Sequence, residues 1–269
     1  MKRIIKSLVP DRVMQSFRSW KLRRELANFS PRVARHSYHG YEFSMHLRDR
    51  VAESWYGKDW DILKEIEILE ESQLVPGSVV FDLGAHQGLV GMILASKVGE
   101  SGKIVAVEGS SRNCEIAKKN FELNQIENVD VVHAVAAEKA GEMVQFSENL
   151  NGSVTRTVTP TRIESVSVDS LASVYGRPQV VFVDVEGYEC QVLRGAKSAL
   201  KHRADFFVEV HIGVGLEDHG SLDELLGFFP EAQFDRYVAE EEGAAFEKYS
   251  QGAELPKQRF YLVAIGRTH

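Results

Sequence analysis

The residues with the clearest chemical signature surround a glycine turn in the segment VVFDLGAHQG, residues 79–88. Its apolar run contains Asp82 and leads to Gly84 and Gly88, and the apolar stretch over 89–98 then has the character of a helix. A strand, a glycine turn and a helix in this order place a ligand at the carboxyl edge of a sheet. The segment therefore predicts a ligand site, and the side chains in the turn indicate which ligand.

These side chains disfavour a dinucleotide. A dinucleotide fingerprint requires glycine where His86 and Leu89 stand, because a side chain at position 86 crowds the pyrophosphate. Asp82 also places a negative charge where a helix N-terminus would otherwise attract phosphate. S-adenosylmethionine has no phosphate, and its methionine end carries an ammonium and a sulfonium, which a carboxylate near Gly84 favours. The turn therefore favours S-adenosylmethionine, although acidic-glycine turns also occur as plain structure.

A second acidic residue extends this predicted donor site. The apolar run over 103–108 ends in Glu108, 24 residues after Gly84, where a carboxylate can accept both ribose hydroxyls. A solvated carboxylate at a strand end is the alternative. Asp130 and residues 133–136 are expected to form the adenine side of the site. The predicted donor-binding residues are Asp82, Gly84, Ala85, His86, Gly88, Glu108, Ala136 and Asp184.

Two further strand ends carry the predicted catalytic residues. The run over 180–183 is followed by Asp184 and Glu186, and strand alternation puts Glu209 and His211 on one face of a strand over 206–211. Ligand crevices lie beyond the carboxyl ends of such strands, so these four side chains are predicted to gather near the transferred methyl group. His211, which ordinarily titrates near neutral pH, and Asp184 are the candidate bases. A hydrogen-bonded structural histidine at the strand end is the alternative for His211.

The same side chains invite two other interpretations. They could supply ligands to Mg²⁺ or another divalent ion, but carboxylates at a strand edge are not by themselves a coordination sphere, so no metal site is predicted. Cys190 invites comparison with cytosine C5 methylation, but it lies in a predicted helix with no proline loop before it. A thiol packed in a helix is favoured, and methylation of nucleic-acid bases is disfavoured.

The elements that must position these residues begin at residue 78, where short apolar runs alternate with helical segments. This is the pattern of an α/β fold with a parallel sheet. Strands are predicted over 79–83, 103–108, 129–135, 179–184 and 206–211, with two weaker ones over 233–238 and 259–265. Helices are predicted over 61–74, 88–98, 111–124, 188–201 and 221–229. Asn151-Gly152 favours a tight turn, so residues 142–169 are predicted to contain an inserted β-hairpin.

The first 60 residues differ from the rest in charge. They hold 13 Lys and Arg against 6 Asp and Glu, so the remainder carries a net charge of −14. Apolar residues at roughly helical spacing over 2–27 predict a basic helical appendage, and residues 36–60 an irregular segment. The appendage either packs on the domain or lies on an anionic membrane surface. The predicted division is therefore an N-terminal appendage over 1–60 and a catalytic domain over 61–269.

Composition argues against several other classes of protein. No apolar run approaches the ~20 residues that span a bilayer, and the acidic main part is a poor general partner for nucleic acid. Cys114 and Cys190 fall in predicted helices of different units, which argues against a disulfide framework and for a reducing cytosol. The predicted localisation is cytoplasmic, with peripheral membrane contact through the basic N-terminus as the open alternative.

Taken together, these segments resemble the FkbM family of methyltransferases. The resemblance covers residues 76–212 and rests on VVFDLGAHQG (79–88), IVAVEGSSRNCEIAKKN (104–120), VSVDSL (166–171), VFVDVEGYECQVLRGA (181–196) and FFVEVH (206–211). It implies a Rossmann-like class I methyltransferase fold with helices on both faces of a mostly parallel sheet of seven strands, the last antiparallel. It also implies O-methylation, often of hydroxyls in glycans or natural products. Phe182 stands where members of the family commonly have lysine.

The sequence therefore predicts an S-adenosylmethionine-dependent O-methyltransferase that acts on a hydroxyl of a saccharide, a glycolipid or a related small molecule. Methylation of a nitrogen or carboxylate on a small metabolite uses the same donor site and remains an alternative. A non-catalytic module that binds the donor is a second alternative. A nicotinamide oxidoreductase is disfavoured by His86 and Asp82, and no oligomeric state is predicted.

Overall fold

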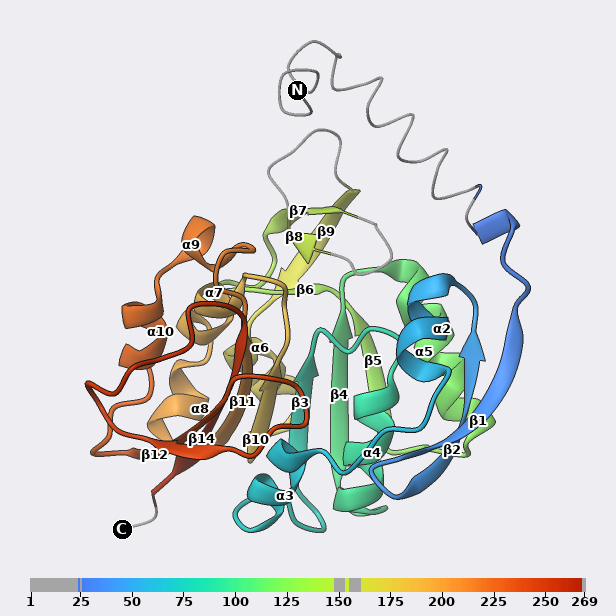
Figure 1. Ribbon diagram of the computed structural model, residues 1–269. Coiled ribbons are helices and arrows are strands. Elements are labelled where there is room, and N and C mark those ends of the chain that lie inside the picture. The colour runs from blue at the N-terminus through green and yellow to red at the C-terminus, as the bar shows by residue number, and fades with distance from the viewer. Residues whose placement is uncertain (1–23, 25, 148–152, 155–160, 268–269) are drawn as a thin grey trace, which may run out of the picture.

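The central feature of the computed structural model is an eight-stranded sheet, found among the described residues 24, 26–147, 153–154 and 161–267. The strand order is β13-β12-β14-β11-β10-β3-β4-β5 (Figure 1). Parallel pairing joins β5 (Val129–His133), β4 (Lys103–Glu108), β3 (Val79–Leu83), β10 (Val180–Val183) and β11 (Asp205–Val210). The carboxyl ends of these strands therefore meet at one edge of the sheet.

The strands beyond β11 in this sheet confirm the predicted fold class. Strand β14 (Phe260–Gly266) runs antiparallel between β11 and β12 (Phe234–Ala239), as expected for the last strand of a class I methyltransferase. The prediction of seven strands misses β13 (Glu247–Tyr249), which pairs with β12 at the edge. This short strand is polar and largely exposed, so no apolar run marks it in the sequence.

Helices cover both faces of the sheet because successive strand residues point to opposite sides. Val80 and Phe182 pack into one hydrophobic cluster, and Phe81 and Val183 pack into another. The first cluster includes α3 (Lys64–Glu70), α4 (Leu89–Val98) and α5 (Ser111–Leu123). The second includes α6 (Val168–Tyr175), α7 (Glu189–Arg194), α8 (Lys197–Lys201), α9 (Leu216–His219) and α10 (Leu222–Gly227).

The prediction of an irregular segment over residues 36–60 is wrong. Strands β1 (Arg32–Tyr38) and β2 (Tyr41–Leu47) form an antiparallel hairpin, and α2 (Arg50–Tyr56) follows it. His39 and Gly40 form the two-residue turn with φ of 51° and 79°, the geometry that suits a hairpin. The many His and Tyr residues mask the alternation, yet Met45 and Leu47 are fully buried. These residues share the core cluster of α4, while the division at residue 60 stays a prediction.

The inserted hairpin is present as part of a small four-stranded sheet. It contains β6 (Val135–Ala136), β9 (Thr161–Val166), β7 (Met143–Ser147) and β8 (Ser153–Val154), in that order. Strands β7 and β8 pair antiparallel with Ser147 opposite Ser153, and the predicted turn at Asn151-Gly152 lies outside the described residues. The predicted strand over 129–135 is too long, because β5 ends at His133 and β6 pairs with β9 instead.

The predicted helix over 188–201 is divided into α7 and α8 at Gly195. A Cβ at Gly195 would lie 2.4 Å from the carbonyl oxygen of Ala137, so the chain passes too close to that segment for any other residue. The predicted basic helix over 2–27 lies almost entirely outside the described residues. Among the residues that the structure describes, no helix combines the length and apolar character required to cross a membrane.

Candidate active site

The glycine turn after β3 brings two strand ends into close contact. Gly84 has φ of +95°, and a Cβ there would lie 1.7 Å from the carbonyl oxygen of Asp184, so only glycine fits. His86 also has a positive φ, of 46°, which is uncommon for a residue with a side chain. Gly88, with φ of 88°, begins helix α4. The turn therefore aligns the ends of β3 and β10 side by side.

Glu108, at the end of β4, is tied to this turn by backbone hydrogen bonds. Its Oε2 accepts from the backbone N–H of His86 at 2.9 Å, and its Oε1 accepts from that of Ser110 at 2.7 Å. Burial raises the pKa of Glu108 to about 7, although these hydrogen bonds oppose the rise. A carboxylate has about four lone-pair sites, so Glu108 keeps acceptor capacity for ribose hydroxyls.

A pocket opens at the carboxyl edge of the sheet beside Glu108. Five predicted donor-binding residues line it, namely Gly84, His86, Glu108, Ala136 and Asp184. Its apolar walls are Val107, Ala134, Val135 and Phe146. An acid at a strand end beside an apolar slot is what a nucleoside needs, with its hydroxyls bound at the acid and its base in the slot. These residues therefore fit the S-adenosyl group.

Three predicted donor-binding residues, Asp82, Ala85 and Gly88, do not line the pocket. Asp82 lies behind the turn, and its Oδ2 is buried and has no hydrogen-bond partner among the described residues. Burial raises the pKa of Asp82 to about 7. On the predicted adenine side, residues 134–136 line the pocket, whereas Asp130 pairs with Lys103 at 2.8 Å and lies outside it.

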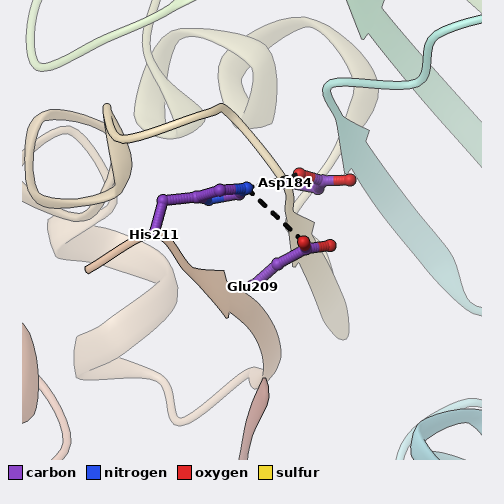
Figure 2. A group of neighbouring side chains, drawn as sticks. All are labelled: Asp184, Glu209 and His211. Carbon is purple, nitrogen blue, oxygen red and sulfur yellow. Dashed lines mark ion pairs between the residues drawn. The ribbon is translucent and has the colours of Figure 1, made fainter. Parts of the chain in front are cut away.

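The four predicted catalytic side chains do meet at one place. The Nε2 atom of His211 lies 3.4 Å from Oε1 of Glu209, 3.6 Å from Oε2 of Glu186 and 3.8 Å from Oδ1 of Asp184. Figure 2 shows the imidazole of His211 pointing toward Asp184 and Glu209. Asp184 and Glu186 line the pocket, so the cluster lies at its boundary. The strand alternation that groups Glu209 with His211 is present as predicted.

Glu189 is a member of this cluster that sequence reasoning missed. Its Oε1 lies 2.7 Å from Nδ1 of His211 and also accepts from the backbone N–H of Gly187 at 2.8 Å. Glu189 is fully buried at the start of α7, where a charged side chain would ordinarily face water. The signal available in the sequence was its place two residues after the Asp-Val-Glu-Gly segment.

The carboxylates around His211 change its protonation state. Burial alone would lower the pKa of His211, but hydrogen bonds to Glu189 and Glu209 raise it to about 11. Desolvation and the charge of Glu209 raise the pKa of Asp184 well above its ordinary value. His211 therefore carries its proton at neutral pH, and the expectation that its ordinary pKa suits it as a base does not apply here.

One group of candidate metal ligands occurs among the described residues. Asp184, Glu209 and His211 each offer an atom, and these atoms lie within 4.8 Å of one another. Arg259 already pairs with Glu209, with Nη1 3.0 Å from Oε1. A guanidinium at this distance occupies one face of the carboxylate that an ion would need. The expectation of no metal therefore stays a prediction.

Helix α2 contributes a pocket residue that was also missed. Trp55 lines the pocket together with the strand-end residues, and its ring centroid lies 5.1 Å from that of His86. The aromatic content of residues 36–60 was visible in the sequence, but the irregular structure expected there gave no reason to place Trp55 at the site.

Comparisons with known proteins identify the family of this chain. A family model described as the methyltransferase FkbM domain matches residues 82–236. A 53-residue segment is 43% identical to a protein-L-isoaspartate O-methyltransferase of Thermotoga maritima and covers 20% of this chain and 17% of that protein. The matched segments span less than half of the curated relatives' own lengths.

Two solved structures are similar in fold. The methyltransferase FkbM of Methylobacillus flagellatus KT is 14% identical with a TM-score of 0.45, over 70% of this chain and 43% of that chain. A SAM-dependent O-methyltransferase of Thermotoga maritima is 14% identical with a TM-score of 0.46, over 91% of this chain and 82% of that chain.

Proposed function

This chain belongs to the FkbM family of S-adenosylmethionine-dependent methyltransferases, and on that premise we propose that it methylates a hydroxyl of a saccharide, a glycolipid or a related small molecule. The observation that supports a hydroxyl acceptor is the cluster of proton-binding groups at the pocket, where Asp184 and Glu186 line the wall beside buried His211. A hydroxyl must lose its proton as the new bond to carbon forms, so it needs an acceptor within reach.

Different residues of this chain would bind the donor and align the acceptor. S-adenosylmethionine supplies a methyl group that its sulfonium has already activated. Glu108 would accept hydrogen bonds from the ribose, and the apolar wall of Ala136 and Phe146 would hold the adenine, since all three residues line the pocket. Alignment of the acceptor in line with the methyl group is worth several kcal/mol of the barrier, up to about 7–11 in well-oriented systems.

Within the cluster, Asp184 is the better candidate for the base. Desolvation and the charge of Glu209 raise its pKa and make it a stronger base than an ordinary carboxylate, and its side chain lines the pocket and is 48% exposed. His211 is 2% exposed and holds its proton, so it acts on Asp184 as a fixed positive charge. The carboxylates of Glu186 and Glu209 also lie beside the imidazolium, with oxygens 3.6 Å and 3.4 Å from Nε2 of His211.

The first experiment identifies the acceptor. The protein is incubated with methyl-labelled S-adenosylmethionine and fractionated cell glycans, lipids and small metabolites, and each fraction is counted for label. Label in a saccharide or glycolipid fraction supports the proposal. Label only in amine or carboxylate metabolites favours the alternative acceptors, and donor binding without label in any fraction favours a non-catalytic module.

The second experiment tests the proton acceptor with the labelled fraction as substrate. Asp184→Asn is expected to lower the transfer rate at saturating donor about 10²–10⁴-fold. The affinity for S-adenosylhomocysteine is measured on the same variant, because Asp184 also lines the donor pocket and a loss of binding must be separated from a loss of transfer. Asp223→Asn, on the exposed start of α10, is the control and should keep full activity. An unchanged rate in Asp184→Asn would contradict activation of a hydroxyl by this carboxylate.

A further inference from the structure

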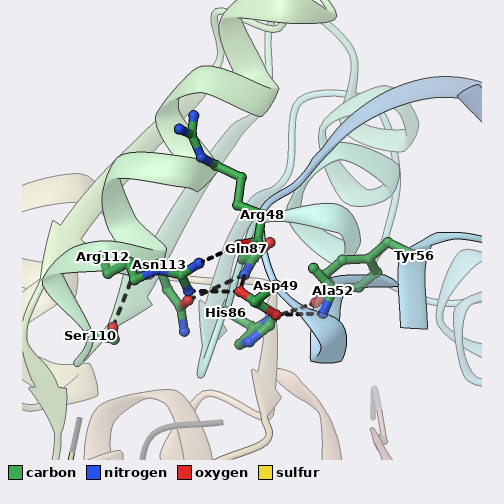
Figure 3. Close-up of polar contacts among 9 residues, drawn as sticks. All are labelled: Arg48, Asp49, Ala52, Tyr56, His86, Gln87, Ser110, Arg112 and Asn113. Atoms are coloured by element: carbon green, nitrogen blue, oxygen red, sulfur yellow. Dashed lines mark hydrogen bonds and ion pairs between the residues drawn. The ribbon is translucent and has the colours of Figure 1, made fainter. Parts of the chain in front are cut away.

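Helix α2 is attached to the glycine turn at its first residues. The side chain of Asp49 caps the helix, with Oδ1 accepting from the backbone N–H of Ala52 at 2.8 Å. Its Oδ2 accepts from Nε2 of Gln87 at 3.1 Å and from Nη1 of Arg112 at 2.7 Å (Figure 3). Asp49 and Gln87 are both buried, so the start of α2 is fixed to the turn and to α5.

The last residue of α2 is attached to the neighbouring position of the same turn. The hydroxyl of Tyr56 lies 2.6 Å from Nδ1 of His86, and both side chains are buried. The hydroxyl of Tyr38, in strand β1, donates to the carbonyl oxygen of Tyr56 and fixes this end from the other side. His86 and Gln87 thus both bind α2, and the helix cannot move without displacing the turn.

Trp55 lies between these two attachments in the chain, and unlike Tyr56 beside it, it is exposed. Its side chain is 38% exposed, whereas Ala52 and Tyr56 on the same helix are buried. The indole packs against His86 on one side and lines the pocket together with Glu108 and Asp184. A half-open aromatic ring that is held rigidly at a pocket provides a face on which a planar or apolar ligand can be buried.

We propose that Trp55 is a donor-binding residue, so that α2, which precedes the segment matched by the family model, completes the donor site. The inference rests on the proposed function, because it requires the S-adenosyl group in this pocket. The donor is favoured over the acceptor because His86, the ring beneath Trp55, donates its backbone N–H to Glu108, the acid assigned to the ribose. Trp55 therefore forms the wall of the pocket next to the residues assigned to the donor.

The test measures binding of S-adenosylhomocysteine by calorimetry to the wild-type protein and to Trp55→Ala and Trp55→Phe. Removal of the ring is expected to weaken binding about tenfold or more, a typical loss when a stacked aromatic is truncated. Phenylalanine keeps a ring face and should bind within about threefold of the wild type. Trp60→Phe is the control, because Trp60 packs on Tyr38 and Tyr56 but does not line the pocket.

Tryptophan fluorescence gives an independent readout on the same variants. The chain has three tryptophans, and addition of S-adenosylhomocysteine should change the emission of Trp60→Phe, which keeps Trp55, but not that of Trp55→Phe. Equal affinity of a folded Trp55→Ala and the wild type would overturn this inference and leave the proposed function intact. Absence of binding to the wild type would overturn both.

Discussion

The titratable residues at the pocket differ in what holds their protons. The pKa values of Glu108 and Asp82 are each raised to about 7 because burial removes water from the carboxyl group; in Glu108 two backbone hydrogen bonds oppose the rise. The pKa of His211 is raised in spite of its burial, because carboxylates surround the imidazole. Of these groups only Glu108 lines the pocket, while Asp82 lies behind the turn and His211 lies behind Asp184 and Glu186, so each should give a different dependence on pH.

Glu108 should make donor binding depend on pH. Because its pKa is raised to about 7, the carboxylate that accepts the ribose hydroxyls predominates only above that pH and is protonated below it. The dissociation constant of S-adenosylhomocysteine is expected to rise between pH 8 and pH 5, by up to about tenfold per pH unit below 7. Calorimetry across this range measures the effect.

Two variants separate Glu108 from its buried neighbour. Glu108→Gln should bind S-adenosylhomocysteine about 10–100-fold more weakly at pH 8, because a charged hydrogen bond is lost, and its affinity should be nearly flat with pH. Asp82→Asn should keep the pH dependence, since Asp82 does not line the pocket. A flat profile in the wild type would contradict the assignment of Glu108 to the ribose.

His211 should remain protonated well above neutral pH. Its pKa in the folded protein is raised to about 11, above the unfolded value of about 6.5. Its contribution to stability is therefore fully present below pH 6.5 and is lost as the pH rises toward 11. Nitrogen-15 NMR of the imidazole in the ligand-free protein should show both ring nitrogens protonated at pH 9.

Glu189→Gln is the comparison for this measurement, because it replaces the buried carboxylate 2.7 Å from Nδ1 by a neutral amide. The pKa of His211 should fall in this variant, and the free energy of unfolding should fall with it at neutral pH. A histidine that titrates near pH 6.5 in the wild type would show that the surrounding carboxylates do not control its proton.

At the scale of elements, the site is formed by the ends of strands and by one helix that precedes them in the chain. The ends of β3 and β10 approach each other because Gly84 has no side chain, and the ends of β10 and β11 bring Asp184 to Glu209 and His211. Asp49 and Tyr56 attach α2 to the glycine turn, and Trp55 of this helix lines the pocket. The geometry of the pocket therefore depends on close contacts between backbone segments as much as on its charged residues.

Gly84→Ala should damage both stability and donor binding. A Cβ at this position lies 1.7 Å from the carbonyl oxygen of Asp184 and must also adopt φ near +95°. The expected loss in the free energy of unfolding is about 3 kcal/mol or more, from overpacking and backbone strain together. Urea titration measures this loss, and calorimetry with S-adenosylhomocysteine measures the accompanying loss of affinity.

Gly227→Ala is the matched control, since a Cβ at this last residue of α10 meets no atom within 4 Å. Alanine has the higher helix propensity by about 1 kcal/mol, so this variant should be as stable as the wild type or slightly more stable. Equal stabilities of the two alanine variants would mean that β3 and β10 do not approach as closely as described.

At the scale of the whole molecule, the hairpin β1–β2 and helix α2 share the core of one face of the sheet. Tyr38, Met45 and Leu47 are fully buried in the cluster that contains α4. The side chains of Asn120 in α5 and of Asn124, which caps α5, accept hydrogen bonds from the backbone N–H groups of His46 and Ser44, respectively, both at 2.9 Å. The segment is thus part of the folding unit that forms the pocket.

Removal of residues 1–60 should therefore prevent cooperative folding. Each large buried side chain contributes about 2–5 kcal/mol to the free energy of unfolding, and the whole free energy of unfolding of a domain is only about 5–15 kcal/mol. Thermal unfolding followed by circular dichroism should lose its cooperative transition in the truncated chain. The substitution Met45→Ala should lower the free energy of unfolding by about 2–5 kcal/mol in the full chain. Wild-type stability of both the truncated chain and the Met45→Ala variant would contradict a shared core.

Much of the central sheet could be predicted from the sequence because its strands are buried on both faces. Strands β3 and β4 have the bounds that their apolar runs indicate, and the acid at the end of β4 lies in the pocket as its distance from the glycine turn predicts. Such runs are local signals, since a buried parallel strand must be apolar at nearly every position. The hairpin β1–β2 has one polar, aromatic-rich face, so it produced no comparable signal.

The sequence by itself determined the fold class, the donor turn and the strand ends on which Asp184, Glu209 and His211 stand, because these depend on local patterns of apolar residues and glycines. Only the tertiary structure decided that buried Glu189 holds the proton of His211, that Asp82 lies behind the turn, and that Trp55 reaches the pocket from α2. Burial and charge act between segments that are distant along the chain, so protonation states and pocket walls follow from packing and cannot be obtained from spacing.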